Sequence, residues 1–184
     1  MSLFKAASTV SLLTLASRVT GLVRDLLMAS VFGANVLTDA FNVAFRIPNL
    51  LRRLFAEGAF SQAFVPILAE YKNTRTHEET RSLIDHITML LGGVLFLVTA
   101  LGIIAAPFII YASAPGFSAN PEKFDLTVQL LQITFPYILF ISFVALAGGI
   151  LNTYGKFNVP AITPALLNLS FIGCAFWLTP LIDP

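Results

Sequence analysis

Three long stretches without a charged residue constrain the fold of this chain more than any other feature. They run over residues 87–111, 126–151 and 159–178. A helix that crosses the hydrocarbon core of a bilayer needs about 20 mostly apolar residues, and each stretch reaches that length. Transmembrane β-strands alternate in polarity over about ten residues, which these stretches do not. Because only helices and closed barrels can span lipid, the sequence predicts an all-α integral membrane protein.

The composition excludes several classes of protein. Hydrophobic residues make up 57% of the 184 residues and charged residues 11%, whereas soluble domains are about 25% charged. The net charge of +1 leaves no basic surplus for a nucleic-acid partner. The single cysteine excludes an intrachain disulfide, and the spacing of His77 and His86 fits no compact metal motif. We therefore expect no metal site, no cofactor and no nucleic acid.

Two further helices are predicted in the first part of the chain, at 6–32 and 40–68. Each is long enough to span a bilayer, but each carries charged side chains within the predicted membrane zone. These are Arg18, Arg24 and Asp25 in the first helix, and Arg46, Arg52, Arg53 and Glu57 in the second. A Gly/Asn turn separates the two helices, and Thr38 and Asp39 are candidate N-caps for the second. The connections between the five predicted helices lie at 33–39, 70–83, 112–125 and 152–158.

The basic residues of these connections predict the orientation. One side of the membrane receives Lys5, Lys72, Arg75, Arg81 and Lys156. The other side receives only Lys123. Since cytoplasmic loops carry the excess of lysine and arginine, we expect a cytoplasmic N-terminus and outward-facing connections at 33–39 and 112–125.

The arginines inside the predicted spans need an explanation, because a charge at the bilayer centre costs about 2.5–3.5 kcal/mol on insertion scales. Long side chains near a helix end can snorkel to the interface. Arg18 and Arg24 lie far from such an end, and we favour a water-filled internal cavity for both. For Arg53 the two interpretations are equally open. The planar fork of arginine matches phosphate, so a cationic cavity predicts an anionic ligand.

Helical spacing sorts the charged groups of the first helix. Arg18, Gly21 and Asp25 are three and four residues apart and share one face. Arg24 lies well around the helix from Arg18. The two arginines can converge on one ligand if the helix bends at Gly21.

In the second helix, one face is shared by Arg46, Asn49, Arg53 and Glu57. Arg52 is predicted to point toward the side of Pro48 and Ala56. Arg53 and Glu57 form an i,i+4 pair of opposite charge, whose simplest effect is mutual neutralisation. The acidic residues are fewer than the arginines, so the cavity stays cationic.

Three sequence motifs stand out at residues 17–71. They are RxxGLxRD, TDAF and FRIPNLLRRLFAEGAFSxAFVP, and the later FPYI and NTYGKF segments agree with them. On these motifs the chain resembles the MurJ/MviN family, lipid II flippases of the multidrug/oligosaccharidyl-lipid/polysaccharide exporter superfamily. The resemblance covers the whole chain, although family members are far longer.

The resemblance implies a function and a location. It implies part of the N-terminal lobe of a two-lobe, alternating-access transporter in the bacterial cytoplasmic (inner) membrane. Such a transporter moves the undecaprenyl-pyrophosphate-linked peptidoglycan precursor to the outer leaflet for cell wall synthesis. The implied partners are lipid II, membrane lipids, the remaining helices of the full-length transporter and cell-wall synthesis enzymes.

The resemblance also assigns roles to particular residues. Arg18, Arg24 and Arg52 match cavity arginines that engage the pyrophosphate, and Asn49 matches a further cavity position. Asp39 and Glu57 match acidic positions important for function. Asp25 joins this acidic set from its place beside Arg24 in the sequence.

Two other functions are weighed against this one. A drug or polysaccharide exporter of the same superfamily is the nearer alternative, but cationic drugs would favour acidic cavity residues. The other is a non-transporting membrane scaffold for cell-wall enzymes, in which the polar faces of the first two helices would be buried in protein. No P-loop, GxSxG or HExxH motif occurs, so we expect a protein that is not an enzyme.

Overall fold

The computed structural model describes residues 3–33, 35–54 and 59–182, and all regular secondary structure in these ranges is helical. The chain divides into two compact units, residues 1–34 with 154–184, and residues 35–153. The first contains α1 (Leu3–Phe32) and α8 (Asn158–Ile182). The second contains α2 (Val36–Arg52), α3 (Ala59–Thr74), α4 (His77–Ile104), α5 (Ala106–Ser113), the 3-10 helix η2 (Pro115–Ala119), α6 (Pro121–Thr134) and α7 (Tyr137–Thr153).

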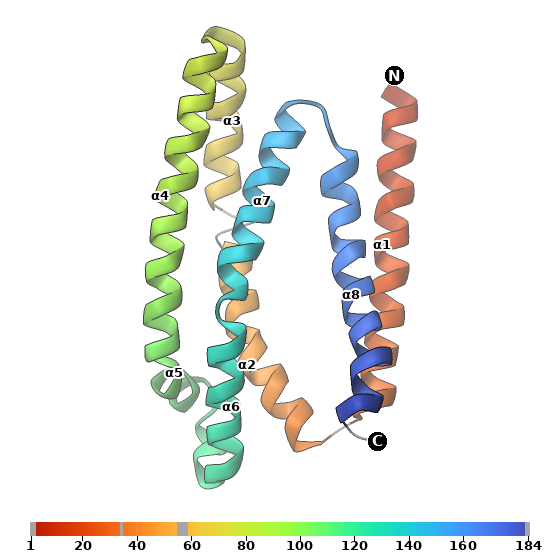
Figure 1. Ribbon diagram of the computed structural model, residues 1–184, viewed down its shortest axis with the longest axis vertical. Coiled ribbons are helices and arrows are strands. Elements are labelled where there is room, and N and C mark those ends of the chain that lie inside the picture. Colours follow the sequence, from red (N-terminus) through yellow and green to blue (C-terminus); the bar gives the residue numbers. More distant parts are fainter. Residues whose placement is uncertain (1–2, 34, 55–58, 183–184) are drawn as a thin grey trace. The chain divides into compact units, whose positions relative to one another are not determined.

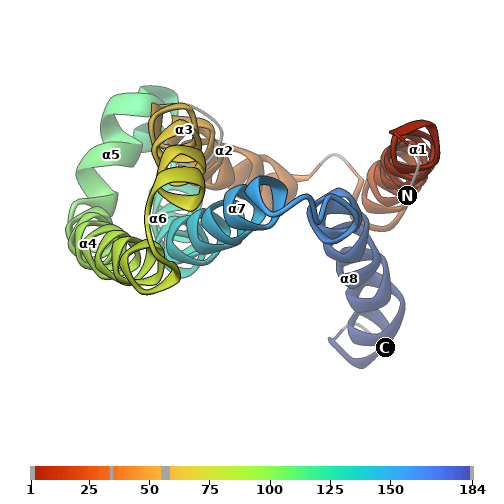
Figure 2. The same ribbon diagram turned by 90° about the horizontal axis from the view of Figure 1, so that it is seen from above.

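In the first unit, α1 and α8 pack side by side (Figures 1 and 2). The end of α1 follows from Gly33, whose φ of 59° lies in the left-handed region that glycine adopts without a steric penalty. Its N–H donates to the carbonyl oxygen of Ala29 at 3.0 Å. Trp177 of α8 is 82% exposed, as expected for a side chain that meets lipid.

The second unit has an apolar core between α2, α3, α4, α5, α6 and α7. The largest side chains that are completely buried in it are Leu68, Leu95, Ile110, Leu131 and Ile138. The outer face of α4 is also apolar, and Met89 on it is 78% exposed. A soluble protein would not present such a helix to water, so the unit is built for a lipid environment.

Two polar contacts show which connections lie at the same end of this unit. Lys72, near the end of α3, donates from its ammonium to the carbonyl oxygen of Thr153 at 2.7 Å. Lys123, in α6, makes an ion pair with Asp39, in α2. Figure 1 shows these two ends at the opposite extremes of α4. Both contacts agree with the predicted sides of the membrane. The first joins the connection at 70–83 to the end of α7, and the second joins residue 39 to the connection at 112–125.

The structure divides two of the predicted segments. The segment 126–151 is α6 and α7, separated at Phe135 and Pro136. Pro136 has no N–H to donate, and the N–H groups of Ile138 and Leu139 instead bond three residues back, each at 3.1 Å. The segment 87–111 is α4 and α5, separated at Ala105, with Pro107 in the first turn of α5.

Other boundaries also differ from the sequence-based expectation. The expected loop at 70–83 is reduced to two residues, because Thr76 and Glu79 form a capping box that starts α4 early. The cap of α2 is Asn35, not Thr38 or Asp39, and its side chain accepts from the N–H of Thr38 at 2.8 Å. The predicted helix at 40–68 corresponds to two helices, α2 and α3. Residues 55–58, which connect them in the sequence, lie outside the described residues.

Within the described residues, three segments are long and apolar enough to cross a membrane, by length and composition. They are His77–Ile104, Pro121–Thr153 and Asn158–Trp177. Each of them overlaps one of the three uncharged stretches of the sequence. The predicted spans 6–32 and 40–68 are not among them, and both carry the charged residues discussed above.

Candidate functional site

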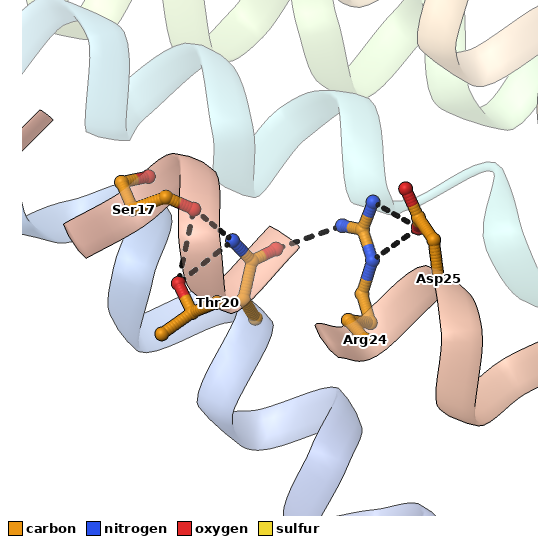
Figure 3. Close-up of polar contacts among 5 residues, drawn as sticks. Ser17, Thr20, Arg24 and Asp25 are labelled. Atoms are coloured by element: carbon orange, nitrogen blue, oxygen red, sulfur yellow. Dashed lines mark hydrogen bonds and ion pairs between the residues drawn. The ribbon is translucent and has the colours of Figure 1, made fainter. Parts of the chain in front are cut away.

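Arg24 is the centre of a polar cluster between α1 and α8. Its Nε and Nη2 both donate to Oδ1 of Asp25, at 3.0 and 2.7 Å. Its Nη1 donates to Oδ1 of Asn168 at 2.8 Å (Figure 3). The guanidinium also lies 5.8 Å from the centre of the Phe171 ring. The side chain of Arg24 is 31% exposed, so these contacts hold it while part of it stays open.

Asn168 connects this arginine to the backbone of α1. The residue is 6% exposed, and its Nδ2 donates to the carbonyl oxygen of Ser17 at 3.0 Å and to Oγ1 of Thr20 at 3.3 Å. A Cβ atom added at Gly21 would lie 3.3 Å from Nδ2, so the glycine permits this close approach. Figure 3 shows Ser17 and Thr20 along one side of α1, with Arg24 and Asp25 further along the helix.

Sequence reasoning did not identify Asn168. The available signal was an amide within the uncharged stretch 159–178. A buried amide in such a segment requires hydrogen-bond partners. The partner, Arg24, is 144 residues away in the sequence, and no local pattern connects the two.

Arg18 lies about 1.7 turns before Arg24 on α1 and is exposed. It makes no hydrogen bond or ion pair with any residue that the structure describes. Asp25 is also largely exposed, at 66%. The convergence of Arg18 and Arg24 on one ligand remains a prediction.

The second unit holds the other predicted residues. Nε of Arg52 donates to Oδ1 of Asn49 at 3.0 Å, from one turn further along α2. The sequence interpretation, which placed Arg52 on the side of Pro48, did not include this bond, which the long side chain makes over an i,i+3 step. Arg46 is exposed. Glu57, and with it the predicted pair with Arg53, lies outside the described residues.

Asp39 lies in the first turn of α2, and its Oδ2 is 3.2 Å from Nζ of Lys123 in α6. The ammonium of Lys123 also lies 4.1 Å from the centre of the Phe117 ring, within the range of a cation–π contact. Lys123 is 19% exposed in its side chain and Asp39 is 63% exposed. Sequence reasoning placed Lys123 outside the membrane but did not pair it with Asp39.

Among the described residues, no group of three or more histidine, cysteine, aspartate or glutamate side chains could hold a metal ion.

A shallow groove of about 480 Å³ lies between α3 and α7. It is lined by Gln62, Val65, Pro66, Ala145, Gly148, Gly149 and Asn152, none of which was a predicted site residue.

The long apolar helices, their exposed large side chains and the arginines on polar helix faces define an all-helical, multi-pass membrane protein. The family described as "Lipid II flippase MurJ" matches residues 28–183. The chain belongs to this family.

Similar proteins support the assignment over the whole chain. The "Lipid II flippase MurJ" of Burkholderia cenocepacia is 53% identical over 180 residues, which cover 98% of this chain and 35% of the relative. The "Probable lipid II flippase MurJ" of Vibrio cholerae is 48% identical, over 97% of this chain and 35% of the relative. A solved structure, "Lipid II flippase MurJ, inward closed conformation", aligns with a TM-score of 0.75 and 35% identity, over 92% of this chain and 36% of that one. This chain thus spans about a third of the length of these relatives.

Proposed function

We propose that this chain acts as part of a full-length lipid II flippase, in the N-terminal lobe of a two-lobe transporter. The transporter carries the undecaprenyl-pyrophosphate-linked peptidoglycan precursor from the inner to the outer leaflet of the bacterial cytoplasmic membrane. The proposal includes five spans, formed by α1, by α2 with α3, by α4 with α5, by α6 with α7, and by α8. It also places the N-terminus in the cytoplasm.

The observation that carries the proposal is the pattern of hydrogen bonds that Arg24 makes. Of its five N–H groups, Nε–H and one on Nη2 are directed to Asp25, and one on Nη1 is directed to Asn168. One N–H on each terminal nitrogen therefore makes no hydrogen bond with a described residue, and each of these two N–H groups can donate to a phosphate oxygen. Neutral Asn168 removes no charge from the guanidinium. Asp25 provides the only carboxylate that the described residues bring to it.

Arg18 and Arg52 complete the proposed binding set. Arg18 is exposed on the same helix as Arg24, and Arg52 is steadied by the side chain of Asn49. Together they would hold the pyrophosphate while the polyprenyl chain stays in lipid. Asp25, Asp39 and Glu57 are the proposed functional acidic residues. Rocking of two lobes about a site near the bilayer midplane would then expose the headgroup on the outer side.

The test is complementation of a bacterium depleted of its own flippase by the full-length transporter. The parent protein should restore growth and remove lipid II from the inner leaflet. Arg24→Ala should fail at normal membrane levels, because the carboxylate that loses its ion pair, Asp25, is 66% exposed. Arg81→Ala is the matched control, since Arg81 is 78% exposed near the start of α4, and it should restore growth fully. Failure of the parent protein to lower inner-leaflet lipid II would contradict the proposal.

A further inference from the structure

We infer that Asn168 is a positioning residue for Arg24: its amide fixes the guanidinium so that one N–H on each terminal nitrogen stays available to a phosphate group. This inference rests on the proposed function. It assigns a role to α8, in which neither the motifs nor the charged residues of the sequence indicated a functional side chain.

The orientation of the Asn168 amide is determined by α1. The backbone carbonyl of Ser17 can only accept, so the atom that meets it at 3.0 Å must be the donor, Nδ2. The same Nδ2 donates to Oγ1 of Thr20. Oδ1 is then necessarily the atom that faces Nη1 of Arg24 at 2.8 Å. A flipped amide would oppose donor to donor at Arg24 and acceptor to acceptor at Ser17.

Burial makes this arrangement rigid. Asn168 is 6% exposed, and a buried amide that loses its partners is costly. Gly21 has no Cβ and so leaves the space in which Nδ2 makes its bonds to α1. Asn168 therefore holds the guanidinium of Arg24 in a fixed position relative to the backbone of α1.

The neutrality of the amide matters as much as its position. Asp25 already accepts two N–H bonds of Arg24 through a single oxygen. A second carboxylate in place of Asn168 would compete with a phosphate for the same cation. An amide oxygen orients the guanidinium and leaves its positive charge for the ligand.

The competing explanation is that Asn168 only joins α8 to α1. Thr20 distinguishes the positioning role of Asn168 from the role of joining the helices. Its Oγ1 accepts a bond that joins α8 to α1. Among the described residues, no contact joins this Oγ1 to Arg24. Thr20→Val keeps the shape of the side chain, removes this bond and leaves the Arg24–Asn168 bond in place. It is the matched control.

The experiment measures the Kd for lipid II of the full-length transporter in detergent, together with the Tm of each variant. We expect Asn168→Leu to weaken binding about tenfold, the scale of one charge-assisted hydrogen bond, and Thr20→Val by less than about twofold. Asn168→Ser, which keeps a small polar side chain but cannot reach Arg24, should weaken binding like Asn168→Leu. Asn168→Ser takes the place of Asn168→Leu in the experiment if the leucine variant does not fold.

A double-mutant cycle tests directly whether Asn168 acts through Arg24. If Asn168 acts through Arg24, then Arg24→Ala combined with Asn168→Leu should bind no more weakly than Arg24→Ala alone. Equal losses in Thr20→Val and Asn168→Leu, or an added loss in the double variant, would overturn the inference. If the parent binds lipid II and Arg24→Ala loses binding while both Asn168 variants keep it, this inference alone fails. If the parent does not bind lipid II, the proposed function fails with it.

Discussion

The ammonium of Lys123 lies 3.2 Å from the carboxylate of Asp39 and so joins the first turn of α6 to the first turn of α2. Asp39 is placed favourably at a helix N-terminus, whereas a lysine in that position is not. The carboxylate of Asp39 and the ring of Phe117 offset this disadvantage for Lys123. Asp39 therefore has a partner within the chain, which gives its proposed functional role a physical basis.

Removing Lys123 should impair function more than stability. An ion pair with one exposed partner contributes about 0.2–1 kcal/mol, so Lys123→Met should lower the free energy of unfolding by no more than about 1 kcal/mol. If Asp39 acts through this pair, Lys123→Met and Asp39→Asn should reduce complementation to a similar extent. Full activity of Lys123→Met beside an inactive Asp39→Asn would show that Asp39 acts on its own.

Gly102 should not tolerate a side chain. It is buried in α4, and a Cβ atom there would overlap the ring of Phe135 at the break between α6 and α7. Overpacking of this kind costs about 1–3 kcal/mol, so Gly102→Ala should lower the Tm of the purified protein.

Gly93 is the matched control in the same helix, because nothing lies within 4 Å of an added Cβ there. Gly93→Ala should keep or raise the Tm, since alanine favours a helix by about 1 kcal/mol over glycine. Phe135→Leu should recover part of the loss in Gly102→Ala. An unchanged Tm in Gly102→Ala would mean that the two helices do not meet at this contact.

The orientation can be tested by labelling single cysteines in intact cells. Cys174, which is exposed, is first replaced by serine. His77→Cys should then be protected from a membrane-impermeant thiol reagent, and Ala119→Cys should react, because the basic residues cluster at the end that holds residue 77. His77 is preferred to Thr76, whose side chain caps α4. Labelling of both positions from the same side would reject the proposed topology.

The sequence predicted the architecture well where a local pattern carries the information. The three uncharged stretches became the three membrane-capable segments, and the all-helical fold and the family were confirmed. The early start of α4 was also visible in principle, because Thr76 and Glu79 have the spacing of a capping box.

The polar contacts of the site were less predictable. The sequence analysis placed Arg52 on the side of Pro48 and did not pair it with Asn49, although their i,i+3 spacing permits the bond. The contacts Arg24–Asn168 and Asp39–Lys123 join residues 144 and 84 positions apart. Such pairs depend on which helices pack together, and neither periodicity nor composition contains that information.

The central claim is that arginine forks, rather than positive charge alone, hold the pyrophosphate of lipid II. Lysine keeps the charge but loses the planar pair of donors. The most direct measurement is the Kd of the full-length transporter for lipid II in Arg18→Lys, Arg24→Lys and Arg52→Lys, with Arg81→Lys as the exposed control. We predict a loss of about tenfold or more in each of the three, on the scale of one or two charge-assisted hydrogen bonds, and no change in the control. Affinities for the three lysine variants equal to that of the parent would contradict the claim.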